Sequence, residues 1–98
     1  KIKAVGEAIK SYTTMPWKFV IGDNQGSSFM LWRSCAAVLL YEDLGFTYQQ
    51  VAEALNQSSH STARDLVTKA RSIKHLDRDL DELKARLAER LAPEELVI

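Results

Sequence analysis

Apolar residues recur at helical spacing along most of this chain. Ile2, Val5 and Ile9 are three or four residues apart, which predicts an amphipathic helix from residue 1 to about residue 12. Residues 13–16 interrupt the pattern. Pro16 suits the first turn of a short second helix over residues 16–21, with Thr14 as its cap.

A third helix is predicted after the polar loop formed by residues 22–28. Ser27 or Ser28 can cap it, and it should run to about residue 43, where Gly45 suits the left-handed residue that ends a helix. Residues 35–41 are a continuous apolar run, so we expect this helix to be buried. Its cysteine, Cys35, is expected to be a small buried hydrophobic residue.

The next two helices form a hairpin. Thr47 and Gln50 have the spacing of a capping box, which predicts a short helix ending near residue 55. Residues 56–59 form a polar turn, and Ser58 or Ser59 should cap a helix that runs to about residue 74. The predicted inner face of that helix consists of Leu66, Val67, Ala70 and Ile73.

A last helix should begin at Asp77 or Asp79 and stop at Pro93. One side of it carries a leucine stripe made of Leu80, Leu83, Leu87 and Leu91. An apolar stripe of this length needs a partner surface. That surface is either the core of the same chain or a second copy, in which case the stripe mediates self-association.

The pattern contains no strand and no repeat, so we expect an all-α bundle of five to six helices. With 98 residues, 46% hydrophobic and 27% charged, the chain is long enough for one modest core. We divide it into a helix-turn-helix domain over residues 1–75 and an amphipathic helix with a tail over residues 76–98. The longest apolar run has seven residues, so no membrane span is expected.

Charge separates the same two segments. Residues 1–75 carry nine basic and six acidic side chains, whereas residues 76–98 carry four basic and seven acidic ones, so +3 and −3 give the net charge of zero. Zero net charge argues against a wholesale polyanion binder. The basic residues of the second hairpin helix nevertheless suggest a local anionic partner, although charge alone favours a solvated helix face.

The sequence offers no set of residues for catalysis or for metal binding. A single cysteine excludes a disulfide framework and a Cys-rich zinc site, and two histidines fifteen residues apart are too few for a metal. His60 and Ser61 are adjacent, with no acidic residue placed to orient them as a triad. We therefore expect neither an enzyme nor a cofactor.

The hairpin has the pattern of a helix-turn-helix, which places the start of its second helix at base edges in the major groove. Short polar and methyl-bearing side chains suit that position. The expected base-contacting residues are His60, Ser61, Thr62 and Ala63. The expected backbone-contacting residues of the hairpin are Ser58, Ser59, Arg64, Lys69 and Arg71.

The stretch from Arg33 to Lys69 resembles the C-terminal DNA-binding domain of DnaA, the bacterial chromosomal replication initiator. That family has a long helix that opens with an arginine, here Arg33, and a short helix matched by residues 47–52. Its signature Arg-Asp-His-Thr-Thr-Val aligns with residues 58–63, here Ser-Ser-His-Ser-Thr-Ala. The resemblance extends over roughly residues 1–75. It implies base reading by His60, Ser61 and Thr62, a basic position at Lys69 and a contact of Arg33 with the DNA backbone.

Two departures from the family predict weaker binding. The family's basic loop before the long helix corresponds to residues 22–28, and no basic residue lies between Lys18 and Arg33. Serines also replace the Arg-Asp pair that precedes the histidine. The chain is expected to be an isolated domain of a relative or a small DnaA-like protein.

The sequence therefore predicts sequence-dependent binding of double-stranded DNA, in replication or transcription control, in the bacterial cytoplasm at the nucleoid. The alternative is a protein-interaction module that kept the fold and lost most of its DNA affinity. The missing basic loop and the acidic, leucine-striped last helix favour that alternative.

Overall fold

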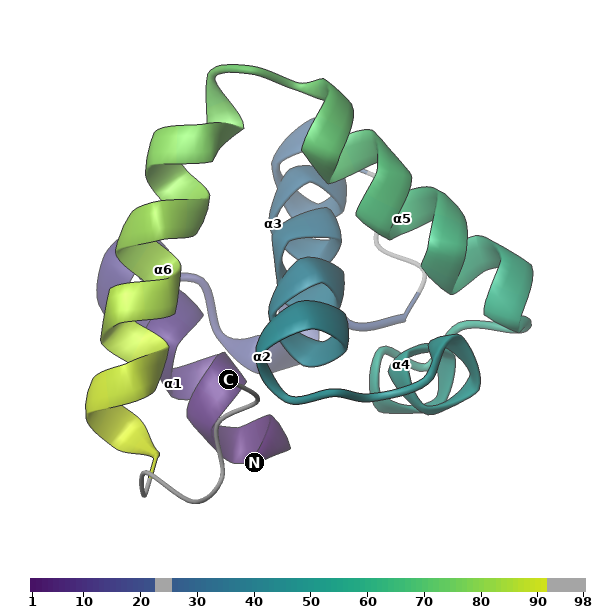
Figure 1. Cartoon of the computed structure of the whole chain (residues 1–98), viewed down its shortest axis with the longest axis horizontal. Helices are drawn as coiled ribbons and strands as arrows, with labels where there is room; N and C mark the ends of the chain where they lie inside the picture. The colour runs from purple at the N-terminus through teal and green to yellow at the C-terminus, as the bar shows by residue number, and fades with distance from the viewer. Residues whose placement is uncertain (23–25, 92–98) are drawn as a thin grey trace.

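The structure is a computed structural model, and it describes residues 1–22 and 26–91. Six α-helices and one π-helical turn follow one another (Figure 1). Their bounds are α1 Ile2–Thr13, α2 Trp17–Val20, α3 Ser27–Val38, the π-turn η1 Leu39–Asp43, α4 Tyr48–Ala54, α5 His60–Ser72 and α6 Leu76–Arg90. No described residue is in a strand. The predicted all-α class is confirmed.

Helix α3 occupies the centre of the molecule (Figure 1). Its second half and the start of η1, residues 33–40, are all buried. From residue 35 on, this stretch is continuously apolar and has no polar side for solvent. Cys35 is buried as expected. Helix α5 packs against α3, α4 packs against α5, and α1 lies between α3 and α6 in contact with both.

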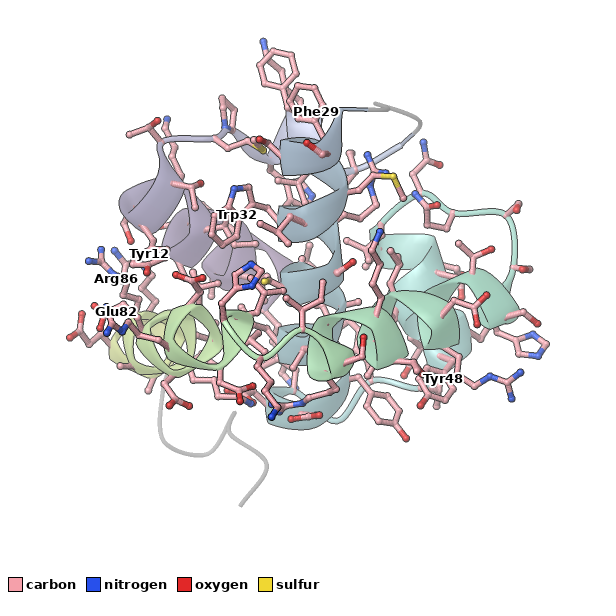
Figure 2. The ribbon with its side chains drawn as sticks, turned by 90° about the horizontal axis from the view of Figure 1, so that it is seen from above. Tyr12, Phe29, Trp32, Tyr48, Glu82 and Arg86 are labelled. Carbon is pink, nitrogen blue, oxygen red and sulfur yellow. The ribbon has the colours of Figure 1, made fainter. Side chains whose placement is uncertain are left out.

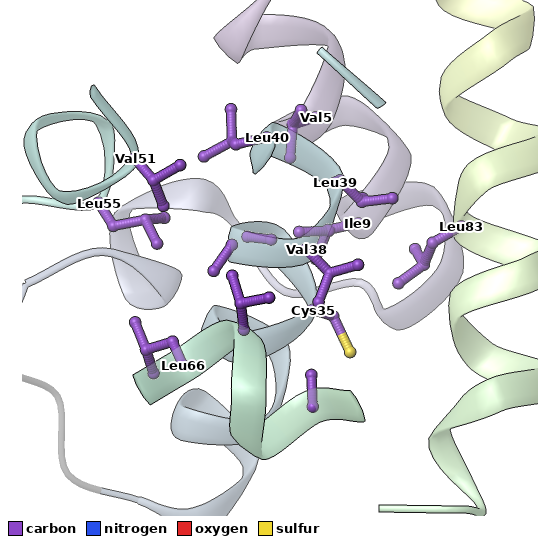
Figure 3. Close-up of a cluster of buried hydrophobic side chains, with 14 of the residues drawn as sticks. Val5, Ile9, Cys35, Val38, Leu39, Leu40, Val51, Leu55, Leu66 and Leu83 are labelled. Atoms are coloured by element: carbon purple, nitrogen blue, oxygen red, sulfur yellow. The ribbon is translucent and has the colours of Figure 1, made fainter. Parts of the chain in front are cut away.

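One hydrophobic core joins all of these helices. Figure 3 shows that side chains from α1, α3, η1, α4, α5 and α6 meet in the same cluster. Its largest fully buried side chains are Ile9, Leu39, Leu40, Leu55, Leu76, Leu80, Leu83, Leu87, Val5, Val20, Val38 and Val51.

The π-turn ends the central helix. The amide of Leu44 donates to the carbonyl of Leu39 at 3.2 Å, five residues back, and the amide of Phe46 donates to Leu40 at 3.0 Å. Gly45 then adopts φ 72°, the left-handed conformation predicted from the sequence. The wider turn places the carboxylates of Glu42 and Asp43 beside α5 and α6, where they form ion pairs.

Several predicted helix ends are wrong by a few residues. Thr14 does not cap α2: it has φ 65° and is the C-cap of α1, with its amide bonded to Lys10. Gly26 rather than a serine is the N-cap of α3. Helix α5 stops at Ser72, and α6 already begins at Leu76 with His75 as its N-cap. Pro93 lies outside the described residues.

The leucine stripe of α6 is part of the chain's own core. Leu80, Leu83 and Leu87 are fully buried, and Leu91 is nearly so. Of the two alternatives for this stripe, the structure shows packing on the core of the same chain: α1, α5 and η1 contact α6, so the stripe is not exposed for self-association. The core also continues across the boundary drawn at residues 75 and 76, so residues 76–91 do not form a core of their own.

Polar contacts reinforce the packing of α6 on α1 (Figure 2). The Tyr12 hydroxyl donates to Asp79 at 2.5 Å, and the Arg86 guanidinium lies 5.2 Å from the centre of the Tyr12 ring. Arg86 also donates to the carbonyl of Ser11 at 3.1 Å. Trp32 of α3 meets the Tyr12 ring edge to face, at 6.0 Å between centroids.

Among the described residues, no helix is long and apolar enough to cross a membrane.

Candidate nucleic-acid interface

Helices α4 and α5 form the predicted helix-turn-helix hairpin. The capping box is confirmed: the amide of Gln50 donates to the Thr47 hydroxyl at 3.1 Å, and the Thr47 amide donates to the Gln50 side chain at 2.9 Å. Ser59 caps α5 by accepting the Thr62 amide at 3.4 Å. Between the helices, Asn56 has φ 57°, a left-handed conformation that asparagine tolerates well.

The turn of the hairpin is hydrogen-bonded to Gly22, two residues after the end of α2. The amide of Gly22 donates to the Leu55 carbonyl at 3.0 Å. The Gln57 side chain in turn donates to the carbonyls of Gly22 and Leu55, each at 3.0 Å. These bonds connect the hairpin turn, which directly precedes α5, to the segment after α2.

Three of the four predicted base-contacting residues lie at the surface of this first turn. His60 and Ser61 are exposed, and Thr62 is partly exposed. The Thr62 hydroxyl also lies 3.2 Å from the Ser59 hydroxyl, so it belongs to the capping network.

Ala63 is the exception. It is fully buried in the core, on the side of α5 that also carries Leu66, Val67 and Ala70. Its position is the first apolar residue of the buried stripe, at i, i+3, i+4 and i+7. The prediction that Ala63 contacts bases is therefore wrong.

Arg33 does not lie where a phosphate could reach it. The side chain is buried with only 4% exposure, and its Nε donates to the carbonyl of Val20 at 2.5 Å. It joins α3 to the C-terminal end of α2. The predicted backbone contact of Arg33 is wrong, because the guanidinium serves an internal carbonyl.

The Arg71 side chain is exposed, but it already forms an ion pair within the chain. Its guanidinium forms a two-point ion pair with the Glu42 carboxylate, whose other neighbour, the Lys84 ammonium, lies 3.4 Å away. The hydrogen bond from Arg71, together with the charges of Arg71 and Lys84, lowers the pKa of Glu42 against the opposing effect of burial. Glu42 thus neutralises a cation predicted to contact phosphate.

The remaining basic residues of the hairpin are Arg64 and Lys69. Both side chains are exposed, and neither forms an ion pair with another described residue. Ser58 is exposed in the turn, and Ser59 is partly buried as the cap. Four positions therefore stay open for backbone contacts: Ser58, Ser59, Arg64 and Lys69.

An aromatic pair lies beside the hairpin. Tyr48 at the start of α4 stacks on Tyr41 of the π-turn, with ring centroids 4.3 Å apart and planes 3° from parallel. The hydrogen bond with Tyr41 raises the pKa of Tyr48, and the nearby charge of Arg64 acts in the opposite direction. Both tyrosines are partly buried and pack against the hydrophobic core.

The exposed face of α5 contains two residues that the sequence analysis did not single out. Asp65 and Thr68 are exposed and follow Ser61 at i+4 and i+7, opposite the buried stripe. Their positions on the helix, opposite Leu66 and Ala70, already predict from the sequence that they are exposed. Asp65 places a negative charge in the middle of the face that would meet DNA, between Arg64 and Lys69.

Within the described residues no group of three or more His, Cys, Asp or Glu is placed to hold a metal ion. Comparison of the chain with protein-family models, with curated proteins and with solved structures finds no match.

Proposed function

We propose that this domain binds double-stranded DNA through the α4–α5 hairpin, with sequence preference set by the first turn of α5. The observation that carries the proposal is the triplet of His60, Ser61 and Thr62 at the surface of the first turn of a capped helix, with His60 and Ser61 exposed and Thr62 partly exposed. In a helix-turn-helix these residues reach base edges. The resemblance of residues 33–69 to the DnaA C-terminal domain supports the same role.

The affinity should be modest. Of the predicted cations, Arg33 is internal and Arg71 is paired with Glu42, so Arg64 and Lys69 are the main phosphate ligands. Two or three phosphate contacts imply a slope of about −2 to −3 in log affinity against log salt. The proposal includes a role in replication or transcription control at the bacterial nucleoid. This part of the proposal depends on DNA binding.

A second function, protein binding through the same face, is favoured by one specific observation. Asp65 lies at the centre of the exposed face of α5, flanked by Arg64 and Lys69. Alternating charges of this kind match a polar protein surface, and they weaken attraction to a uniformly negative backbone.

Selection of duplexes from a random pool, followed by salt titration of the best site, separates the two functions. DNA binding predicts an enriched motif and the slope of about −2 to −3. Arg64→Ala and Lys69→Ala should each make the slope shallower by about 0.9. No enrichment together with a slope near zero would favour the protein-binding function.

A further inference from the structure

An apolar groove runs along α1 and the start of α2. It has a volume of about 440 Å³, and its apolar lining comes from Ile2, Gly6, Pro16 and Trp17. Ile2 also lines an adjoining hollow of about 410 Å³ together with Phe46 and Ala54. Ile2 is 38% exposed, which is unusual among the large apolar side chains of this protein.

Gly6 and Trp17 shape the groove. A Cβ atom on Gly6 would lie 3.4 Å from the Cβ of Trp17 and 3.5 Å from its ring, so the tryptophan packs directly against the backbone of α1. The indole is only partly buried by this contact. One wall of the groove is therefore a fixed aromatic surface with area left to bury.

Charged residues of α1 line the same groove. Lys3 and Lys10 flank Glu7, giving a net charge of +1. None of the three forms an ion pair with a described residue, although their spacing along the helix would allow it. A complementary segment would therefore carry both carboxylates and bulky aliphatic side chains.

We propose that this groove binds residues 94–98 of the same chain, Glu94-Glu95-Leu96-Val97-Ile98. The two carboxylates match Lys3 and Lys10, and the three aliphatic side chains match the apolar lining formed by Ile2 and Trp17. Residues 92–98 lie outside the described part of the chain, so only their sequence and their covalent distance from Leu91 bear on this assignment.

The segment can reach the groove. Leu91 is buried at the end of α6, which packs along α1. Residues 92 and 93 join it to the segment, so Glu94 lies within about 10 Å of Leu91 and Ile98 within about 25 Å when the chain is extended; the molecule is 25 Å across in its two shorter dimensions. Tethering makes the contact intramolecular, so a weak interaction suffices to occupy the groove.

The test measures how well a quencher in solution reaches Trp17. Trp32→Phe leaves Trp17 as the only tryptophan and keeps an aromatic ring against Tyr12. In this background, Leu96→Ser/Val97→Ser/Ile98→Ser should raise the acrylamide quenching constant of Trp17 and shift its emission to the red. Circular dichroism verifies that each variant keeps its helical content.

A charge exchange separates docking from a general effect on folding. Glu94→Lys/Glu95→Lys and Lys3→Glu/Lys10→Glu should each increase quenching, and their combination should restore the protected state. Lys69→Glu/Lys74→Glu, which makes the same charge change at exposed positions of α5 and beyond, is the matched control and should leave quenching unchanged.

Unchanged quenching in the triple-serine variant, or no recovery in the combined charge exchange, would overturn the proposal. Protection that grows with protein concentration and accompanies dimer formation in sedimentation would also overturn it, because the occupant would then belong to a second copy.

Discussion

Arg71 of α5 and Glu42 of the π-turn form a two-point ion pair across 29 residues of sequence. Arg71 Nε donates to Glu42 Oε2 at 2.9 Å, and a terminal nitrogen of the guanidinium donates to Oε1. The pair anchors the C-terminal half of α5 on the central helix. It also withdraws one positive charge from the surface proposed to bind DNA.

Glu42→Gln should strengthen DNA binding. Removing the carboxylate frees Arg71 for one phosphate contact, so the salt slope should become steeper by about 0.9. Fluorescence anisotropy with the selected duplex over a range of salt concentrations measures this change. Glu89→Gln removes one negative charge from the exposed surface of α6 and serves as the control, with an unaltered slope. Equal slopes for both variants would show that Arg71 does not reach DNA when released.

The same pair predicts a pH dependence of stability. Because the pKa of Glu42 is lowered in the folded protein from its ordinary value of 4.5, the carboxylate stabilises the fold above about pH 4.5. This contribution is lost as the pH falls through the lower, folded-state pKa. Both side chains are partly exposed, so the effect is at most about 1 kcal/mol.

Urea unfolding of the wild type and of Glu42→Gln from pH 7 to pH 3 measures this contribution. The wild type should be the more stable protein at pH 7, and the difference should disappear in acid. A difference that persists at pH 3 would mean that the substitution acts through packing instead.

Replacing His60 or Thr62 by alanine should relax sequence preference, at a cost of about 1–3 kcal/mol on the preferred site. His75→Ala is the matched control, because His75 is an exposed histidine at the start of another helix. Competition between preferred and scrambled duplexes measures the preference. If both hairpin variants keep the wild-type ratio, these residues do not read bases.

The leucines of α6 should behave as core residues. Leu83→Ala should destabilise the fold by about 2–5 kcal/mol, as is usual for a fully buried leucine. Leu83→Glu/Leu87→Glu should unfold the chain, whereas Ala85→Glu, on the exposed side of the same helix, should not. Thermal unfolding monitored by circular dichroism tests all three. A double variant that stays folded and lowers the mass in sedimentation would instead revive self-association.

Cys35 should be inert in the folded protein. Burial raises the pKa of its thiol to about 12, so the reactive thiolate is scarce at neutral pH and the sulfur is shielded from reagents. Modification by an aromatic disulfide reagent should be slow in buffer and fast in urea. Rapid modification of the native protein would reveal local opening of α3.

The helical pattern of this fold is local information, and the sequence predicts it well. The capping box of Thr47 and Gln50 and the left-handed Gly45 depend only on neighbouring residues. The end of α1 is a counterexample. Thr14 looks like a helix-capping threonine but adopts a left-handed conformation, because the chain must turn there so that Trp17 packs on Gly6.

The surface position of the candidate site can also be predicted from neighbouring residues. The position of His60, Ser61 and Thr62 at the surface follows from helix phase and from the cap at Ser59. The burial of Ala63 also follows from that phase, since it lies three residues before Leu66. Helix phase therefore separates Ala63 from His60, Ser61 and Thr62, although the four residues are consecutive.

Tertiary structure alone decided which cations are available and which surface covers the leucines. Arg33 turns inward because Val20, thirteen residues earlier, presents a carbonyl to it, and Arg71 meets Glu42 because a π-turn rotates the end of the central helix. The leucines of α6 face α1 rather than a second chain. The sequence determines helices and their apolar faces through short-range periodicity. The partner of each face and each charge depends on contacts between distant residues, which periodicity does not encode.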